Sequence, residues 1–142
     1  MTIRLKPLVT LAMALAAGVS MAVAEEDTPL SKQMSAMNKS LRTLKRQAAD
    51  ASKKTENLEL IAKMKTNVAE GLKLEPAKTK DQPAADKPKY LDNYKAQMAE
   101  LDKALDSLKA AIDKGDTAGA QAIFDKLGDI KEKGHKDFAP DE

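Results

Sequence analysis

Apolar residues recur along most of this chain in alternating steps of three and four positions, the spacing that places side chains on one face of an α-helix. The first pattern holds Leu30, Met34, Met37, Leu41, Leu44, Ala48 and Ala51, and the second holds Leu58, Ile61, Met64, Val68 and Leu72 with Glu56 beside them. The third holds Leu91, Tyr94, Met98, Leu101, Leu105, Leu108 and Ile112, and the fourth holds Ala120, Ile123, Phe124, Leu127, Ile130 and Phe138. No stretch alternates apolar and polar residues for long, so the sequence predicts four helices and no strands.

Turn and cap residues separate the four patterns. Thr-Pro at 28–29 is typical of a helix start, and Lys-Lys-Thr at 53–55 predicts the first turn. Pro76 ends the second helix, and residues 73–88 hold three prolines and no helical period. That composition indicates a linker, which we expect to cross one end of the domain. Lys-Gly-Asp at 114–116 predicts a helix end followed by a new N-cap.

A short turn, a longer connection and a second short turn predict an all-α fold, an antiparallel up-down-up-down four-helix bundle. Sustained steps of three and four are typical of helices that pack in this way. In such a bundle the first and last helices are neighbours, so the two ends of the domain come together. No helix is apolar on all sides, which argues against a bundle embedded in a membrane.

The first 24 residues have the pattern of a secretory signal. Arg4 and Lys6 precede an apolar run at 8–19, and Ala-Val-Ala at 22–24 is a small-x-small cleavage site. We therefore expect cleavage after Ala24 and a mature domain of residues 25–142. The alternative is an N-terminal anchor that stays uncleaved.

Loss of the signal makes the domain electrically neutral. The chain has 24 basic and 22 acidic residues, and removal of Arg4 and Lys6 leaves 22 of each. The domain has no basic excess, and no aromatic side chains interleave with a basic patch, which argues against nucleic-acid binding. The chain has no cysteine. A hydrophobic core without disulfides must therefore stabilise the domain.

His135 is the only histidine of the chain. Neither a Ser-His-Asp nor a Cys-His motif is recognisable, which argues against a hydrolase. A di-iron carboxylate site uses a Glu-x-x-His element on each of two helices, and a chain with one histidine can supply only one, at 132–135. On a helical wheel His135 lies about 20° from Phe124, so it borders the apolar stripe. Gly128 and Gly134 on the same side indicate room for a flat group. The alternative is a partly exposed histidine near a fraying helix end.

Thioether and aromatic residues gather at the same end of the predicted bundle as this histidine. The first and third helices begin where the second and fourth finish, which brings together Met34, Tyr90, Tyr94, Leu72 and His135. A histidine and a methionine that face each other across the core suit the iron of a haem. The alternative is that the methionine and the tyrosines only pack in the core and bind no ligand. The spacing alone does not decide whether Met34 or Met37 would be the methionine ligand.

Two segments of the chain resemble the cytochrome b562 family, and the likeness extends over nearly the whole mature domain. The last predicted helix, from residue 119, ends in Gly-His-Lys-Asp-Phe at 134–138, with the histidine near the C-terminus and an aromatic residue three positions later. Residues 34–38 read Met-Ser-Ala-Met-Asn, which is similar to the Met-x-x-hydrophobic-Asn pattern of the family's first helix. Tyrosines stand where the family usually has a pair of phenylalanines, and the third helix is longer than the family pattern leads us to expect.

The resemblance implies a site as well as a fold. It implies that Met34 and His135 are the axial ligands of a haem iron. It also implies that Tyr90 and Tyr94 flank the haem and that Lys131 helps to hold its propionates. There is no Cys-x-x-Cys-His motif, so the cofactor would be haem b held without covalent bonds.

The expected function is that of a periplasmic protein that carries single electrons and is not an enzyme, because both axial positions of the iron would be filled. Its expected partners are haem and an unidentified redox protein, with neither nucleic acid nor, in the mature form, a membrane. The alternative is a haem-free periplasmic helical bundle that acts as a binding or chaperone-like protein.

Overall fold

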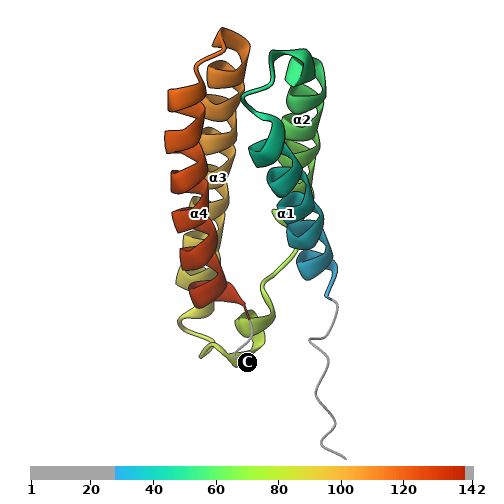
Figure 1. The fold of residues 1–142 in the computed structure, drawn as a ribbon. Helices are drawn as coiled ribbons and strands as arrows, with labels where there is room; N and C mark the ends of the chain where they lie inside the picture. The colour runs from blue at the N-terminus through green and yellow to red at the C-terminus, as the bar shows by residue number, and fades with distance from the viewer. Residues whose placement is uncertain (1–27, 140–142) are drawn as a thin grey trace, which may run out of the picture.

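The computed structural model describes residues 28–139, and within this range all regular secondary structure is helical, without strands. The elements in chain order are α1 (Pro29–Gln47), η1 (Ala51–Lys53), α2 (Lys54–Gly71), η2 (Ala77–Asp81), α3 (Lys87–Lys114) and α4 (Thr117–Phe138), as Figure 1 shows. The predicted signal peptide lies outside the described residues. None of the described helices is long and apolar enough to cross a membrane.

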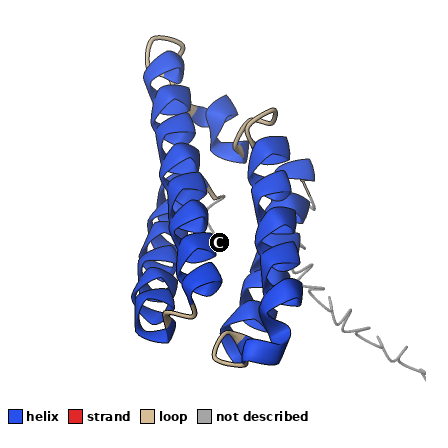
Figure 2. Cartoon of the chain, turned by 90° about the horizontal axis from the view of Figure 1, so that it is seen from above, coloured by secondary structure: helices blue, strands red, loops and turns tan. Residues whose placement is uncertain are grey.

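The helices form two antiparallel hairpins, α1–α2 and α3–α4, which lie side by side (Figures 1 and 2). Extensive contacts join α1 to α2, α2 to α3 and α3 to α4. This confirms the predicted all-α, up-down-up-down four-helix bundle. In Figure 1, α1 begins and α4 ends at the end of the bundle that the α2–α3 connection crosses.

Three predicted helix boundaries are confirmed. The Thr28 hydroxyl accepts a hydrogen bond from the Ser31 N–H at 3.1 Å and caps α1. Gly115 ends α3 with φ of 68°, a left-handed conformation that glycine adopts without steric cost. The Asp116 carboxylate accepts from the Gly119 N–H at 2.8 Å and starts α4.

The first turn lies earlier than predicted, at residues 48–53 and not at 53–55. The Asp50 carboxylate accepts a hydrogen bond from the Ser52 N–H at 2.9 Å, which starts η1 and allows α2 to begin at Lys54. Ala51 is consequently exposed in this turn and not on the inner face of a helix. On the inner side of the turn, the Gln47 amide donates to Oδ1 of the buried Asn57 at 2.9 Å.

The second helix ends at Gly71, before the predicted stop at Pro76. Leu72, which the pattern placed inside, is 41% exposed because the helical period ends one residue before it. The linker crosses one end of the bundle, as predicted, and it contains η2. Pro76 and Thr79 of this linker are buried, so the connection is packed against the helices.

The core is one cluster of buried apolar side chains from all four helices. Its largest fully buried apolar members are Leu44, Ile61, Met64, Val68, Leu105, Leu108 and Leu127. They occupy positions of the predicted helical stripes, which confirms that the spacing of apolar residues identifies the inner face of each helix.

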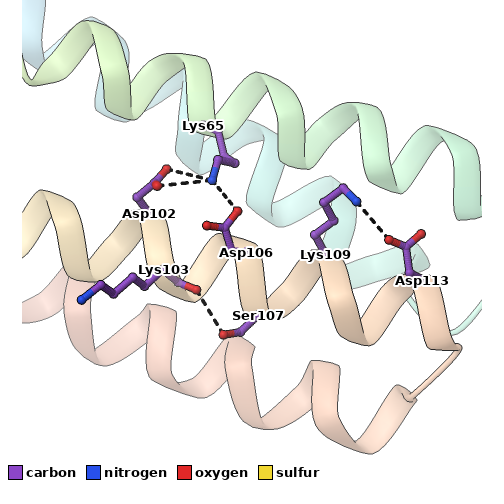
Figure 3. Close-up of polar contacts among 7 residues, drawn as sticks. All are labelled: Lys65, Asp102, Lys103, Asp106, Ser107, Lys109 and Asp113. Atoms are coloured by element: carbon purple, nitrogen blue, oxygen red, sulfur yellow. Dashed lines mark hydrogen bonds and ion pairs between the residues drawn. The ribbon is translucent and has the colours of Figure 1, made fainter.

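An ion-pair network joins α2 to α3 on the outside of the core (Figure 3). The Lys65 ammonium lies 3.2 Å from a carboxylate oxygen of Asp102 and also forms an ion pair with Asp106. The hydrogen bond to Asp106 raises the pKa of Lys65, while burial lowers it to a smaller extent. Because the three side chains remain partly exposed to solvent, such a network contributes on the order of 1 kcal/mol at most.

Two glycine substitutions should change stability in opposite directions. Gly128 is exposed in the middle of α4, and a Cβ there would meet nothing within 4 Å. Gly128→Ala should therefore raise the free energy of unfolding by about 1 kcal/mol. Gly115→Ala should lower it by about 1–2 kcal/mol, because alanine is strained at positive φ. Urea denaturation measures both values, and a shift of the same sign in the two variants would contradict these helix assignments.

Candidate functional site

A cavity of about 690 Å³ opens between α1 and α4 and reaches inward to α2 and α3. Its size lies within the usual range for small-molecule and cofactor sites, about 300–1,000 Å³. The inner wall is apolar and includes every methionine of the described chain, Met34, Met37, Met64 and Met98. No aspartate or glutamate lines the cavity.

Four of the five residues that the resemblance assigns to the site line this cavity. Met34 and His135 reach it from α1 and α4 respectively, Tyr94 reaches it from α3, and Lys131 lies one turn before His135 on α4. Met34 is half-buried, whereas His135 and Lys131 are exposed. Met37, the competing methionine, is buried and lines the same cavity.

Tyr90 does not line the cavity. It lies on a neighbouring hollow between α3 and α4, and its hydroxyl donates to the Asp137 carbonyl at 3.4 Å. Its ring centroid is 5.2 Å from that of Phe138, which does line the cavity. Tyr90 therefore contacts the wall of the cavity only indirectly, by packing against the ring of Phe138. Leu72, exposed beyond the end of α2, does not line the cavity either, so the predicted convergence is wrong at that residue.

The two glycines of α4 that the sequence analysis singled out, Gly128 and Gly134, lie in different surroundings. Gly134 lines the cavity, and a Cβ there would come within 3.1 Å of the Gln97 Oε1. The cavity beside Gly134 agrees with the predicted room for a flat group, and the Gln97 contact shows that α4 also packs closely against α3 here. Gly128 faces solvent with open space around it, so the same prediction is wrong there.

The sequence model of the cytochrome b562 family matches residues 29–139. The chain belongs to this family. No curated protein and no solved structure matches the chain. The family is one of haem-binding bundles that transfer electrons, and its members are electron carriers and not enzymes.

The residues that line the cavity fit a haem. A flat, largely apolar macrocycle requires an apolar cavity between helices, and the α1–α4 cavity has apolar walls. Iron requires donors such as imidazole and thioether, and both line the cavity. The acidic groups of the cofactor require basic side chains that are not already paired with carboxylates. Three basic residues line the cavity, Lys39, Arg42 and Lys131, and no acidic residue lines it. Elsewhere in residues 28–139, no group of three or more His, Cys, Asp or Glu side chains could hold a metal ion.

Gly71, at the end of α2, lies directly behind Met34. A Cβ at Gly71 would come within 2.8 Å of the Met98 Cε and within 3.2 Å of the Met34 Cε. The two thioether methyl groups therefore crowd together against bare backbone. The pattern of apolar residues could not reveal this contact, because a glycine at a helix end indicates only a stop.

Tyr94 binds the same backbone. It is 5% exposed, and its hydroxyl donates to the Gly71 carbonyl at 2.7 Å. Burial raises the pKa of Tyr94 to about 12. The ring also packs edge-on against Phe138, with centroids 5.4 Å apart. Tyr94 thus links the ends of α2 and α4 beside the cavity.

Gly71→Ala should displace Met34 and Met98 while the fold is preserved, because the crowded atoms are the ends of flexible side chains. In the haem-free protein labelled with ¹³C at the methionine methyl groups, the NMR signals of Met34 and Met98 should shift. Those of Met37 and Met64 should remain in place. Gly128→Ala is the matched control and should move none of the four. Equal shifts of all four signals after Gly71→Ala would contradict the contact.

The stability of the protein should fall as the pH rises from 10 to 12, in part through Tyr94. Below pH 10, the ordinary pKa of tyrosine, the hydroxyl is protonated in both states and its contribution is complete. Above that pH the unfolded chain loses the proton while the native chain keeps it up to about pH 12. The loss should reach about 2–3 kcal/mol.

Urea denaturation of the wild-type protein and of Tyr94→Phe across this pH range isolates the contribution of Tyr94, because the two proteins share all other titrating groups. The variant should be less stable by about 1 kcal/mol below pH 10, where it lacks the hydrogen bond to Gly71, and should decline less above it. Parallel curves for the two proteins would show that Tyr94 ionises equally in both states.

Proposed function

We propose that this chain is an exported, periplasmic b-type cytochrome that carries single electrons. In this proposal haem b binds without covalent bonds in the α1–α4 cavity, with Met34 and His135 as its axial ligands. The observation that supports it most is that the only histidine of the chain and a methionine of the first helix line one apolar cavity from α4 and α1. Family membership supports the haem and the electron transfer.

Each residue has a separate task in this proposal. The haem supplies a redox centre that exchanges one electron. The His135 imidazole and the Met34 thioether hold the iron, and thioether ligation favours the reduced state relative to two imidazoles. Because both positions are held by the protein, no open position remains for a substrate. The apolar walls exclude water and limit rearrangement between oxidation states.

The level of the residues along the bundle favours Met34 over Met37. Met34 lies five residues from the start of α1 and His135 three residues from the end of α4, at the same end of the bundle. At about 1.5 Å per residue, they lie about 7.5 Å and 4.5 Å from those helix ends, whereas Met37 lies about 12 Å in. The Met-x-x-hydrophobic-Asn pattern makes the same choice, since Met37 fills its hydrophobic position and Asn38 follows.

The flanking residues orient the cofactor. In this proposal Tyr94 contacts it directly, and Tyr90 acts by fixing the ring of Phe138. Lys131 holds a propionate. Residues 1–24 direct the chain across the inner membrane and are removed, which supports the periplasmic location.

Titration of the purified mature protein with haemin tests the proposal. We expect a Soret band that saturates at one haem per chain and a low-spin, six-coordinate spectrum after reduction. His135→Ala should weaken haem binding by more than about tenfold, and Met34→Ala should convert the reduced spectrum to a five-coordinate form. Met37→Ala is the matched control and should keep the six-coordinate spectrum.

Three results would overturn parts of this proposal. If the wild-type protein gains no Soret band, the haem-free binding or chaperone-like bundle replaces it. If Met37→Ala and not Met34→Ala alters the reduced spectrum, the methionine ligand is Met37. If His135→Ala leaves both spectra unchanged, the imidazole is not a ligand.

A further inference from the structure

The charge of the described domain is concentrated on one helix. Residues 28–139 hold 22 basic and 17 acidic side chains, and α1 holds five of the basic ones and none of the acidic ones. The remaining described residues are therefore balanced, with 17 of each sign. The five cations of α1 are Lys32, Lys39, Arg42, Lys45 and Arg46, and all are exposed. The acidic residues that complete the charge of the mature chain lie outside the described range, at 25–27 and 141–142.

These five residues, the α1 basic face, lie within an arc of about 140° on the helical wheel. The arc lies away from the stripe that contains the buried Met37 and Leu44. Two of its members, Lys39 and Arg42, line the cavity. On the opposite wall Lys131 adds a further cation, so the mouth of the cavity is basic on both sides.

The basic face is not neutralised within the described domain. Lys53, Lys65, Lys73 and Lys109 of other elements pair with nearby carboxylates. Among residues 28–139, no ion pair involves a cation of α1; Arg46 donates only a long hydrogen bond to Thr43, and the Lys45 ammonium lies 5.8 Å from the ring of Phe124. Like charges three and four residues apart on a helix repel one another. Each such pair destabilises the helix slightly, and an anion bound at this face would relieve the repulsion.

We propose that the α1 basic face docks an acidic redox protein over the mouth of the cavity. This inference rests on the proposed function, because it places the partner where Lys39 and Arg42 border the cofactor cavity. A carboxylate-rich partner would be steered to this face at long range and held by several weak ion pairs, as suits a complex that must dissociate after one electron has passed.

A protein fits this face better than a membrane surface does. Helices that lie on membranes insert an apolar side among the lipids. The apolar side of α1 instead faces the core, where Met37 and Leu44 are buried. Leu72, the large apolar residue that is exposed in the described domain, belongs to the end of α2 and not to α1.

Binding of a short polyglutamate peptide to the ¹⁵N-labelled mature protein at low salt tests the proposal. Amide shifts should be confined to α1 and the adjacent end of α4. Lys39→Glu/Arg42→Glu should weaken binding about tenfold or more, and high salt should abolish it. The matched control, Lys95→Glu/Lys103→Glu, makes the same change in net charge at exposed positions of α3, which has no extensive contact with α1. It should weaken binding less than about threefold.

Equal weakening by the two variants, or shifts spread over α3, would overturn the proposal, since binding would then follow net charge alone. Vesicles of phosphatidylglycerol and phosphatidylcholine distinguish the membrane reading. If the vesicles bind the protein more tightly than the peptide does, and if Lys39→Glu/Arg42→Glu abolishes vesicle binding, the α1 basic face binds a membrane surface. Haemin titration of the same sample separates the two proposals: peptide binding on α1 without a Soret band overturns the proposed function and leaves the α1 basic face in place as a docking surface for an acidic protein.

Discussion

The packing of α2 against α3 is the contact on which the rest of this structure depends. Each of these helices holds one outer helix, α1 or α4, through extensive contacts, whereas α1 and α4 are separated by the cavity over part of their length. The distance between the cavity walls is thus set by the central pair. Both helices contribute buried apolar side chains to the common core, and Lys65 with its two aspartates reinforces their packing at the surface (Figure 3). A cofactor site between the first and last helices follows from the up-down-up-down order, and it brings together residues that lie a hundred positions apart in the sequence.

The cavity lining and the backbone behind it combine a soft part with a rigid part. The rigid part lies behind the lining: Gly71 presents no side chain toward Met34 and Met98, and its carbonyl is held by the Tyr94 hydroxyl at 2.7 Å. The soft part is the set of four methionine side chains, which can change rotamers without a large loss of packing. This combination lets the cavity adapt to a flat ligand while the helix ends around it stay in place. It also explains why a residue remote from the chemistry, Gly71, belongs to the site.

Local rules accounted for much of the fold and for part of the site. The steps of three and four predicted the inner faces, because burial alone decides which side of an amphipathic helix turns inward. Thr28, Gly115 and Asp116 marked helix ends, since each acts on backbone groups within a few residues. The first turn was misplaced because the Asp50 cap and the Gln47–Asn57 hydrogen bond interrupt a pattern that continues in the sequence. The end of α2, and with it the exposure of Leu72, depends on how the linker packs, which apolar spacing does not encode.

For the site, topology was sufficient to bring Met34, Tyr94 and His135 to one cavity. The position of Tyr90 behind Phe138 and the contact of Gly71 with two methionines depend on the azimuth of neighbouring helices, and this information exists only in the packed structure.

The last turn of α4 links the proposed chemistry to the local stability of the chain end. The Ala139 N–H donates to the His135 carbonyl at 2.9 Å, and the helix stops immediately afterwards. Terminal helical turns open at low free energy, and a ligand that binds only the closed form stabilises it by mass action. On the proposed function, an iron-bound imidazole would hold this turn shut. Amide hydrogen exchange at the C-terminal end of the domain would then report cofactor occupancy, and loss of haem would begin with unwinding of the final helical turn.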